Sequence, residues 1–130
     1  MHGGETRPTI DPIHLARDIN SSSCAVPAQF TLRLLGGKWV IPIIEVLSAR
    51  PRRHGELRRA LGPAVHEKVL TETLRRMEDA RLVDREVQPG LSPTVLYGLT
   101  ELGLSLLEPM RHLAVWTITH QHELDIDVWR

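Results

Sequence analysis

Residues Val65 to Met77, which read VHEKVLTETLRRM, decide the fold of this chain. Leu70, Leu74 and Met77 recur at i, i+4 and i+7, the spacing of an apolar stripe along one side of an α-helix. The opposite side carries two cations, a hydroxyl and a carboxylate, from Lys68, Thr71, Glu72 and Arg75. A helix held by one face, with long polar side chains on the other, suits the major groove of DNA. An ordinary surface helix has the same pattern, so the flanking segments must decide.

The segments before this helix complete a second pattern. Residues 38–49, KWVIPIIEVLSA, are apolar nearly all round and predict a buried central helix that Pro51 ends. Residues 54–61 predict a third short helix, and Gly62-Pro63 turns the chain into the stretch quoted above. Two short helices joined by a tight, glycine-containing turn are typical of a helix-turn-helix.

Toward the N-terminus the pattern weakens. Residues 1–26 are polar, with the run Ser21-Ser22-Ser23, and we interpret them as a flexible arm. Pro27 suits a helix start, so residues 28–35 predict a short amphipathic helix that Gly36-Gly37 ends.

After Met77 the apolar period changes from that of a helix to that of a strand. Residues 82–87 and 95–99 form two β-like runs on either side of the segment 89–93, which reads PGLSP. This arrangement predicts a β-hairpin with a stiff loop. A helix-turn-helix followed at once by a hairpin is a winged helix.

The last long segment predicts a helix that Thr100 caps. Its apolar positions form a wide stripe that includes Leu102, Leu106, Met110, Leu113 and Trp116. So broad an apolar surface near a chain end seldom stays exposed on a soluble monomer. We interpret the stripe as a homodimer interface, with folding back onto the chain's own core as the alternative. Residues 124–130 predict a short tail.

Composition limits the class of protein. The 130 residues suit one compact domain, which we place at residues 27–123, and a hydrophobic content of 42% supports a core. No apolar run approaches the ~20 residues that span a bilayer, and the start of the chain has no hydrophobic signal region. We therefore expect neither membrane insertion nor export. One cysteine, Cys24, excludes an internal disulfide and fits the reducing cytoplasm.

Charge is balanced overall but not locally. The chain has 16 Lys and Arg against 16 Asp and Glu, and this zero net charge gives nucleic-acid binding no support by itself. Residues 50–61 nevertheless carry five arginines against the single acid Glu56, whereas the segment from residue 101 onward is acidic. Electrostatic footprints are local, so the basic segment is the part suited to DNA.

With these segments in order, the chain resembles the HxlR-type winged helix-turn-helix transcriptional regulators over about residues 27–116. No single matching segment is specific, but the ordered series is. The segments are 35–39 (LGGKW), 51–53 (PRR), 56–61 (ELRRAL), 68–71 (KVLT) with Leu74-Arg75, Tyr97, 99–103 (LTELG) and 108–116.

The resemblance implies a mainly α fold with a small β-hairpin wing and flanking dimerisation helices. It also implies a homodimer that presents two recognition helices to successive major grooves of a double-stranded DNA operator. By position, the recognition helix carries Lys68, Thr71, Glu72 and Arg75, and the basic helix and the turn before it carry Arg52, Arg53, Arg58 and Arg59. Members repress or activate nearby genes, and several respond to electrophiles or oxidants, so a small-molecule effector is expected.

The chain departs from this family pattern at positions that bear on function. Redox-responsive relatives carry a cysteine directly before the proline of the first core helix, where this chain has Val26, and Cys24 lies two residues earlier. Thiol sensing is therefore not implied. Between Val87 and Thr100 the wing has no cation, so we expect few wing contacts to phosphates. Three further residues differ from the family pattern. His66 replaces the serine that usually caps the recognition helix, His54 replaces an aromatic residue, and Arg81 replaces a glycine after the recognition helix.

Other candidate sites have weaker support. Phe30, Trp39 and Trp116 are candidates for lining an effector pocket, although aromatic residues more often belong to an ordinary core. His120 and His122 are spaced i and i+2, which point apart on a helix, so we expect no metal site. The sequence has no nucleophile–base motif and no glycine-rich phosphate loop, so we expect neither an enzyme nor a cofactor.

The sequence thus predicts a dimeric, sequence-specific DNA-binding regulator. The rival hypothesis is a winged-helix module that binds proteins or small molecules and no longer binds DNA. Net neutrality, the acid Glu72 on the groove face and the uncharged wing favour the rival, whereas the basic segment 50–61 favours DNA.

Overall fold

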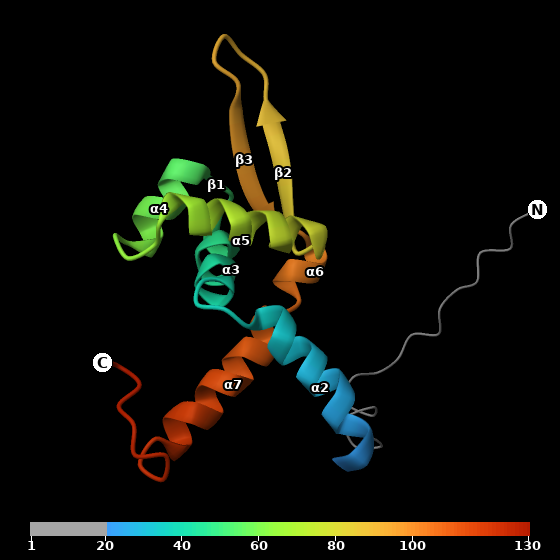
Figure 1. Ribbon diagram of the computed structural model, residues 1–130, viewed down its shortest axis with the longest axis vertical. Coiled ribbons are helices and arrows are strands. Elements are labelled where there is room, and N and C mark those ends of the chain that lie inside the picture. The colour runs from blue at the N-terminus through green and yellow to red at the C-terminus, as the bar shows by residue number, and fades with distance from the viewer. Residues whose placement is uncertain (1–20) are drawn as a thin grey trace, which may run out of the picture. The chain divides into compact units, whose positions relative to one another are not determined.

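The computed structural model describes residues 21–130 and divides into two units between Gly36 and Gly37, which are described separately (Figure 1). Most of the predicted flexible arm, residues 1–20, lies outside the described residues.

The described part of the first unit is helix α2 (Ser21–Leu35). We predicted a helix starting at Pro27, and this was wrong, because the helix begins six residues earlier and Pro27 lies inside it. A proline removes one backbone donor and crowds the carbonyl four residues before it, at a cost of about 3 kcal/mol, but the turns on either side remain possible. The helix ends at Leu35, directly before the predicted Gly36-Gly37, and the Gly36 backbone N–H donates to the carbonyl of Arg33 (3.3 Å).

The second unit is built around helix α3 (Val40–Ala49). As its apolar sequence predicts, this helix is central, and Ile43 and Ile44 are completely buried. Its C-terminal residue is followed by Arg50 in an extended conformation (φ −170°, ψ 161°), which Pro51 enforces.

The helix-turn-helix consists of α4 (His54–Leu61) and α5 (Glu67–Asp79), and both helices are confirmed (Figure 1). Gly62 has a φ of 94° in the turn between them, a conformation that favours glycine. Helix α5 buries the predicted stripe of Leu70, Leu74 and Met77, and adds Thr73. This packing fixes which side of α5 faces solvent.

The wing contains β2 (Val83–Gln88) and β3 (Thr94–Leu99), which form the predicted antiparallel hairpin. A two-residue strand, β1 (Arg52–Arg53), pairs with the other edge of β3, so the strand order is β1-β3-β2. We predicted a turn for this segment, because two residues are too short to show a period of two.

The predicted final helix is two helices, α6 (Glu101–Leu104) and α7 (Leu107–His120). The break follows from Pro109, which has no N–H to donate and fits the first turn of a new helix better than the interior of a longer one. Thr100 caps α6 as predicted, because its Oγ1 accepts a hydrogen bond from the Gly103 N–H (3.0 Å). A Cβ on Gly103 would overlap the carbonyl oxygen of Leu82, so α6 packs closely on the start of the wing.

Candidate nucleic-acid interface

One face of α5 presents the predicted recognition residues to solvent, since all four of its polar side chains are exposed: Lys68, Thr71, Glu72 and Arg75. The opposite face is fixed in the core by Leu70 and Leu74, which are 0% and 1% exposed. The helix therefore holds the polar residues in a constant register relative to the rest of the second unit. The predicted N-cap, His66, precedes the helix and makes no side-chain capping hydrogen bond.

The charged side chains on this face form only weak ion pairs. Lys68 Nζ lies 4.0 Å from Glu72 Oε1, and both side chains are more than half exposed. Such an exposed pair contributes about 0–1 kcal/mol, so either partner can leave it for DNA. Arg75 forms no ion pair within 4.0 Å among the residues that the structure describes.

A hydrogen bond between α4 and α5 was not anticipated from the sequence. His54 Nε2 lies 3.0 Å from Thr71 Oγ1, and the same hydroxyl donates to the carbonyl of Glu67 at 2.9 Å. The His54 ring is also 6.4 Å from the Tyr97 ring, measured between centroids. The two bonded residues are 17 apart in the sequence, so only the packing of α4 on α5 brings them together. The signal in the sequence was the histidine in place of the usual aromatic.

The four predicted phosphate-contacting arginines have different environments. Arg53, Arg58 and Arg59 are exposed, and the Arg58 guanidinium lies 3.9 Å from the Glu67 carboxylate. Arg52 is half-buried, and its Nε is buried without a hydrogen-bond partner. Arg52 and Arg53 differ in exposure because both lie on β1, where successive side chains point to opposite faces.

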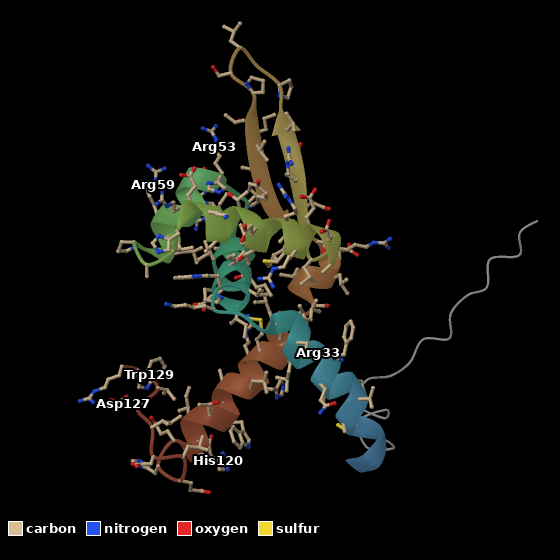
Figure 2. All side chains as sticks on the ribbon, in the orientation of Figure 1. Arg33, Arg53, Arg59, His120, Asp127 and Trp129 are labelled. Carbon is tan, nitrogen blue, oxygen red and sulfur yellow. The ribbon has the colours of Figure 1, made fainter. Side chains whose placement is uncertain are left out.

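Two of these arginines line a polar hollow between α4 and the wing. Arg53 and Arg59 lie on one side of the second unit (Figure 2), and with Gln88 and Leu96 they border a cavity of about 530 Å³. We predicted no wing residue beside the arginines, because a sequence pattern does not show how the wing packs against α4.

Glu56 orders the start of α4 and pairs with Arg50, not with the four arginines predicted to contact phosphates. Its carboxylate accepts from the backbone N–H of Arg53 and from the Arg50 guanidinium, both at 3.2 Å. The backbone hydrogen bond, followed by the one from Arg50, lowers the pKa of Glu56 below its ordinary value. The acid is thus already engaged with Arg50 and the helix start.

The predicted interface residues on the C-terminal helices are largely uncovered. Helix α7 has no buried residue, and Leu113 and Trp116 are 49% and 54% exposed. Leu102 lies on α6 and is also exposed, whereas Leu106, between the helices, and Met110 are half-buried.

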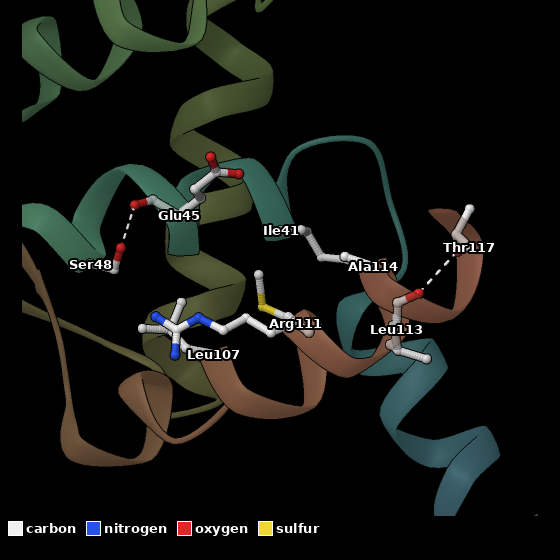
Figure 3. Close-up of a pocket in the computed structure, with 9 residues that line it drawn as sticks. Ile41, Glu45, Ser48, Leu107, Arg111, Leu113, Ala114 and Thr117 are labelled. Carbon is white, nitrogen blue, oxygen red and sulfur yellow. Dashed lines mark hydrogen bonds between the residues drawn. The ribbon is translucent and has the colours of Figure 1, made fainter. Parts of the chain in front are cut away.

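A groove runs between α3 and α7 (Figure 3), with a volume of about 480 Å³. Its wall is mainly apolar, from Ile41, Leu107, Met110, Leu113 and Ala114, with Glu45, Ser48, Arg111 and Thr117 adding polar groups. The predicted pocket residues do not line this groove. Phe30 is exposed on α2, Trp39 precedes α3 with Lys38 Nζ 5.3 Å from its ring centroid, and Trp116 stacks on His120 at 5.0 Å.

Other chemistry has little support within the described residues. Cys24 is exposed on α2. In the described part of the chain, no group of three or more His, Cys, Asp or Glu residues could hold a metal ion. Every helix between residues 21 and 130 falls short of the length and apolar character that a membrane crossing requires.

Comparisons with known proteins agree with this geometry. The family described as HxlR-like helix-turn-helix matches residues 34–125. The HTH-type transcriptional regulator BH0655 of Halalkalibacterium halodurans is 36% identical over 97 residues, which cover 74% of this chain and 85% of that protein.

Among solved structures, a MarR-family regulator of Enterococcus faecalis superposes with a TM-score of 0.73 at 30% identity, covering 83% of this chain and 97% of that one. The redox regulator HypR in its reduced form gives 0.69 at 32% identity, covering 76% and 97%. The winged helix-turn-helix expected from the sequence is thereby confirmed, and the chain belongs to the HxlR-like helix-turn-helix family of DNA-binding transcriptional regulators.

Proposed function

We propose that this regulator binds a double-stranded DNA operator as a homodimer in the cytoplasm, with α5 of each copy in a major groove. The observation that carries the proposal is the one-sided burial of α5, whose apolar face is fixed in the core while its polar face is exposed: Lys68, Thr71, Glu72 and Arg75. Long donors on a fixed helix can reach both phosphates and base edges.

Arginines flanking α5 support the same orientation. Arg53, Arg58 and Arg59 are exposed on β1 and α4, beside the helix that would enter the groove. They would neutralise backbone phosphates and position the protein without reading sequence. Arg52 contributes less in this scheme, because part of its guanidinium group is buried.

The dimer would form through the apolar surface of α6 and α7. Leu102, Leu113 and Trp116 expose large apolar area there. Covering it with the same surface of a second copy gives a two-fold assembly, which matches the two half-sites of a palindromic operator.

A small-molecule effector would bind in the groove between α3 and α7. The groove joins the central helix under the helix-turn-helix to the helix of the proposed dimer interface, so an occupant would affect both. N-Phenyl-1-naphthylamine, a neutral apolar fluorophore, should bind there. Ala114→Trp, which fills the groove, should abolish its fluorescence gain, whereas Trp116→Ala should not. The opposite result would favour the predicted aromatic pocket.

The test of DNA binding is selection from a randomised duplex pool, followed by gel shift with the selected sequence and with DNA from upstream of the protein's own gene. The wild-type protein should select one two-fold symmetric sequence. Arg75→Ala should lose base preference at one position of each half-site, roughly 1–3 kcal/mol if the arginine contacts guanine through two hydrogen bonds. If the wild-type protein selects no sequence at low salt, the rival module without DNA binding is favoured.

A further inference from the structure

We propose that His54 fixes the hydrogen-bonding role of Thr71, so that Thr71 accepts from base amino groups and does not donate to base carbonyls. His54 is then a positioning residue, which acts on DNA only through Thr71. The inference rests on the proposed function, in which α5 lies in the major groove.

The geometry places two protein partners on one hydroxyl. Thr71 Oγ1 is 2.9 Å from the carbonyl oxygen of Glu67, one turn earlier on α5, and 3.0 Å from His54 Nε2 at the start of α4. The side chain of Thr71 remains exposed on the polar face of the helix. The hydroxyl is therefore held by both helices of the helix-turn-helix and still open to a ligand.

A threonine hydroxyl has one proton and two acceptor positions. If His54 carries a proton on Nε2, that N–H donates to Thr71 Oγ1, and the hydroxyl proton goes to the Glu67 carbonyl. If Nε2 is unprotonated, two lone pairs would face each other unless the hydroxyl donates to the ring nitrogen. In both cases a protein acceptor, the Glu67 carbonyl or the unprotonated Nε2, lies beside the hydroxyl. Turning the proton toward a base would leave an Oγ1 lone pair facing that acceptor, so the arrangement favours acceptance from DNA over donation to it.

In the major groove this capacity matches a small set of base groups. The amino groups of adenine (N6) and cytosine (N4) are donors there, whereas guanine N7 and O6 and thymine O4 are acceptors. Thr71 should therefore favour adenine or cytosine at the base it faces and disfavour guanine or thymine. The face of α5 is then divided between the donors Lys68 and Arg75 and the acceptors Thr71 and Glu72.

The usual aromatic at the position of His54 would not impose this restriction, because a phenyl ring offers no nitrogen to the hydroxyl. With phenylalanine, only the Glu67 carbonyl still orients the Thr71 hydroxyl, so the hydroxyl is freer to rotate and to donate to a base acceptor as well as accept. His54→Phe also keeps a ring of similar size facing Tyr97, where the two rings are now 6.4 Å apart. This substitution removes the hydrogen bond while preserving the packing.

The experiment is selection from a randomised duplex pool with six proteins: wild type, His54→Phe, Thr71→Val, the double variant, Arg75→Ala and His54→Gln. Wild type should prefer adenine or cytosine at one half-site position by about two- to tenfold, the value of one neutral hydrogen bond. His54→Phe and Thr71→Val should each reduce that preference to near one and leave other positions unchanged. The double variant should show no further change, because both substitutions remove the same interaction.

His54→Gln is the matched rescue, because its side-chain amide, like the histidine ring, can donate to or accept from Thr71 Oγ1, and it should retain the preference. Equal melting temperatures of all variants would exclude a folding effect on these ratios. The proposal is overturned if His54→Phe keeps the wild-type preference, if Thr71→Val keeps it, or if the two effects add. A wild-type protein that selects no sequence overturns the proposed function as well. Selection by wild type that Arg75→Ala relaxes and His54→Phe does not would overturn this inference alone.

Discussion

Helices α5 and α7 are nearly equal in length, 13 and 14 residues, but differ in what covers them. Helix α5 has four apolar residues among 13 and buries three of them together with Thr73. Helix α7 has seven apolar residues among 14 and buries none. The more apolar helix is thus the less covered one within a single chain.

The difference fits the two partners that we propose for these helices. Helix α5 is stabilised by its own chain and exposes charged and hydroxyl groups, the surface that DNA requires. Helix α7 leaves large apolar side chains exposed, among them Leu113 and Trp116, and the proposed second copy would cover such area. Stability should therefore depend on protein concentration through α7 but not through α5.

The largest effect should come from the buried side of α5. Leu74→Ala removes a side chain that is 1% exposed and should lower the free energy of unfolding by about 2–5 kcal/mol. Urea denaturation followed by circular dichroism measures this change, and it should be the same at low and high protein concentration.

Leu113→Ala is the matched control on α7, where the leucine is 49% exposed. Its effect should be within about 0.5 kcal/mol in dilute solution, as for other surface changes, and should grow as the protein concentration rises. Equal effects of the two substitutions at every concentration would show that α7 is covered within its own chain.

The second effect concerns the dimer itself. Leu113→Glu with Trp116→Glu would place four unpaired carboxylates in a two-fold interface, and burying an unpaired charge is costly. The dimer dissociation constant should rise roughly 100-fold or more, which analytical ultracentrifugation would measure. Val87→Glu, on an exposed apolar residue of the wing, should leave the dimer intact. A wild-type protein that stays monomeric at tens of micromolar would contradict the interface.

The third effect concerns the salt dependence of DNA binding, which the exposed arginines should set. The triple variant Arg53→Ala, Arg58→Ala, Arg59→Ala removes six arginines from the proposed dimer and should reduce the slope of log K against log[salt] by about 5.4, or about 0.9 for each phosphate no longer neutralised. Arg52→Ala should change this slope least, because its Nε is buried. Fluorescence anisotropy with the selected operator measures both slopes. If Arg52→Ala lowers the slope by as much as each arginine of the triple variant does, the Arg52 guanidinium contacts DNA.

Much of the fold could be predicted because the deciding segments have strong periods. The stripe of α5 and the apolar α3 are long enough to show a helical repeat, and residues 54–61 were predicted with the observed bounds. Strand β1 is too short for any repeat. The break before α7 was visible in Pro109, but the apolar stripe continued through it and outweighed the proline.

The candidate site was predictable only where it lies on one helix. A helical wheel places Lys68, Thr71, Glu72 and Arg75 on one face, because the period alone sets that relation. The bond from His54 to Thr71 depends on how α4 packs against α5. The burial of the Arg52 Nε depends on a strand pairing that the sequence does not specify.

The smallest predicted change in stability concerns the residues that follow the two helices. A residue of positive φ follows each helix. It is Arg81 (61°) after α5 and Asp125 (52°) in the turn after α7. In both places the N–H of the following residue donates to the carbonyl five positions earlier. The Leu82 N–H donates to Met77 (2.9 Å), and the Ile126 N–H donates to Gln121 (3.1 Å). This geometry usually takes a glycine, because a Cβ is crowded in the left-handed region.

Arg81→Gly should therefore raise the free energy of unfolding by about 0.5–1 kcal/mol, the relief of strain less the greater freedom that glycine has in the unfolded chain. Asp125→Gly should gain less, because a short polar side chain tolerates this conformation by bonding locally, and because Asp125 follows a helix that the core does not hold. Arg81→Ala separates the cause, since it removes the charge but keeps the Cβ and should give no gain. Urea midpoints of the three variants measure these differences. A gain in Arg81→Ala equal to that in Arg81→Gly would assign the effect to charge and not to the backbone.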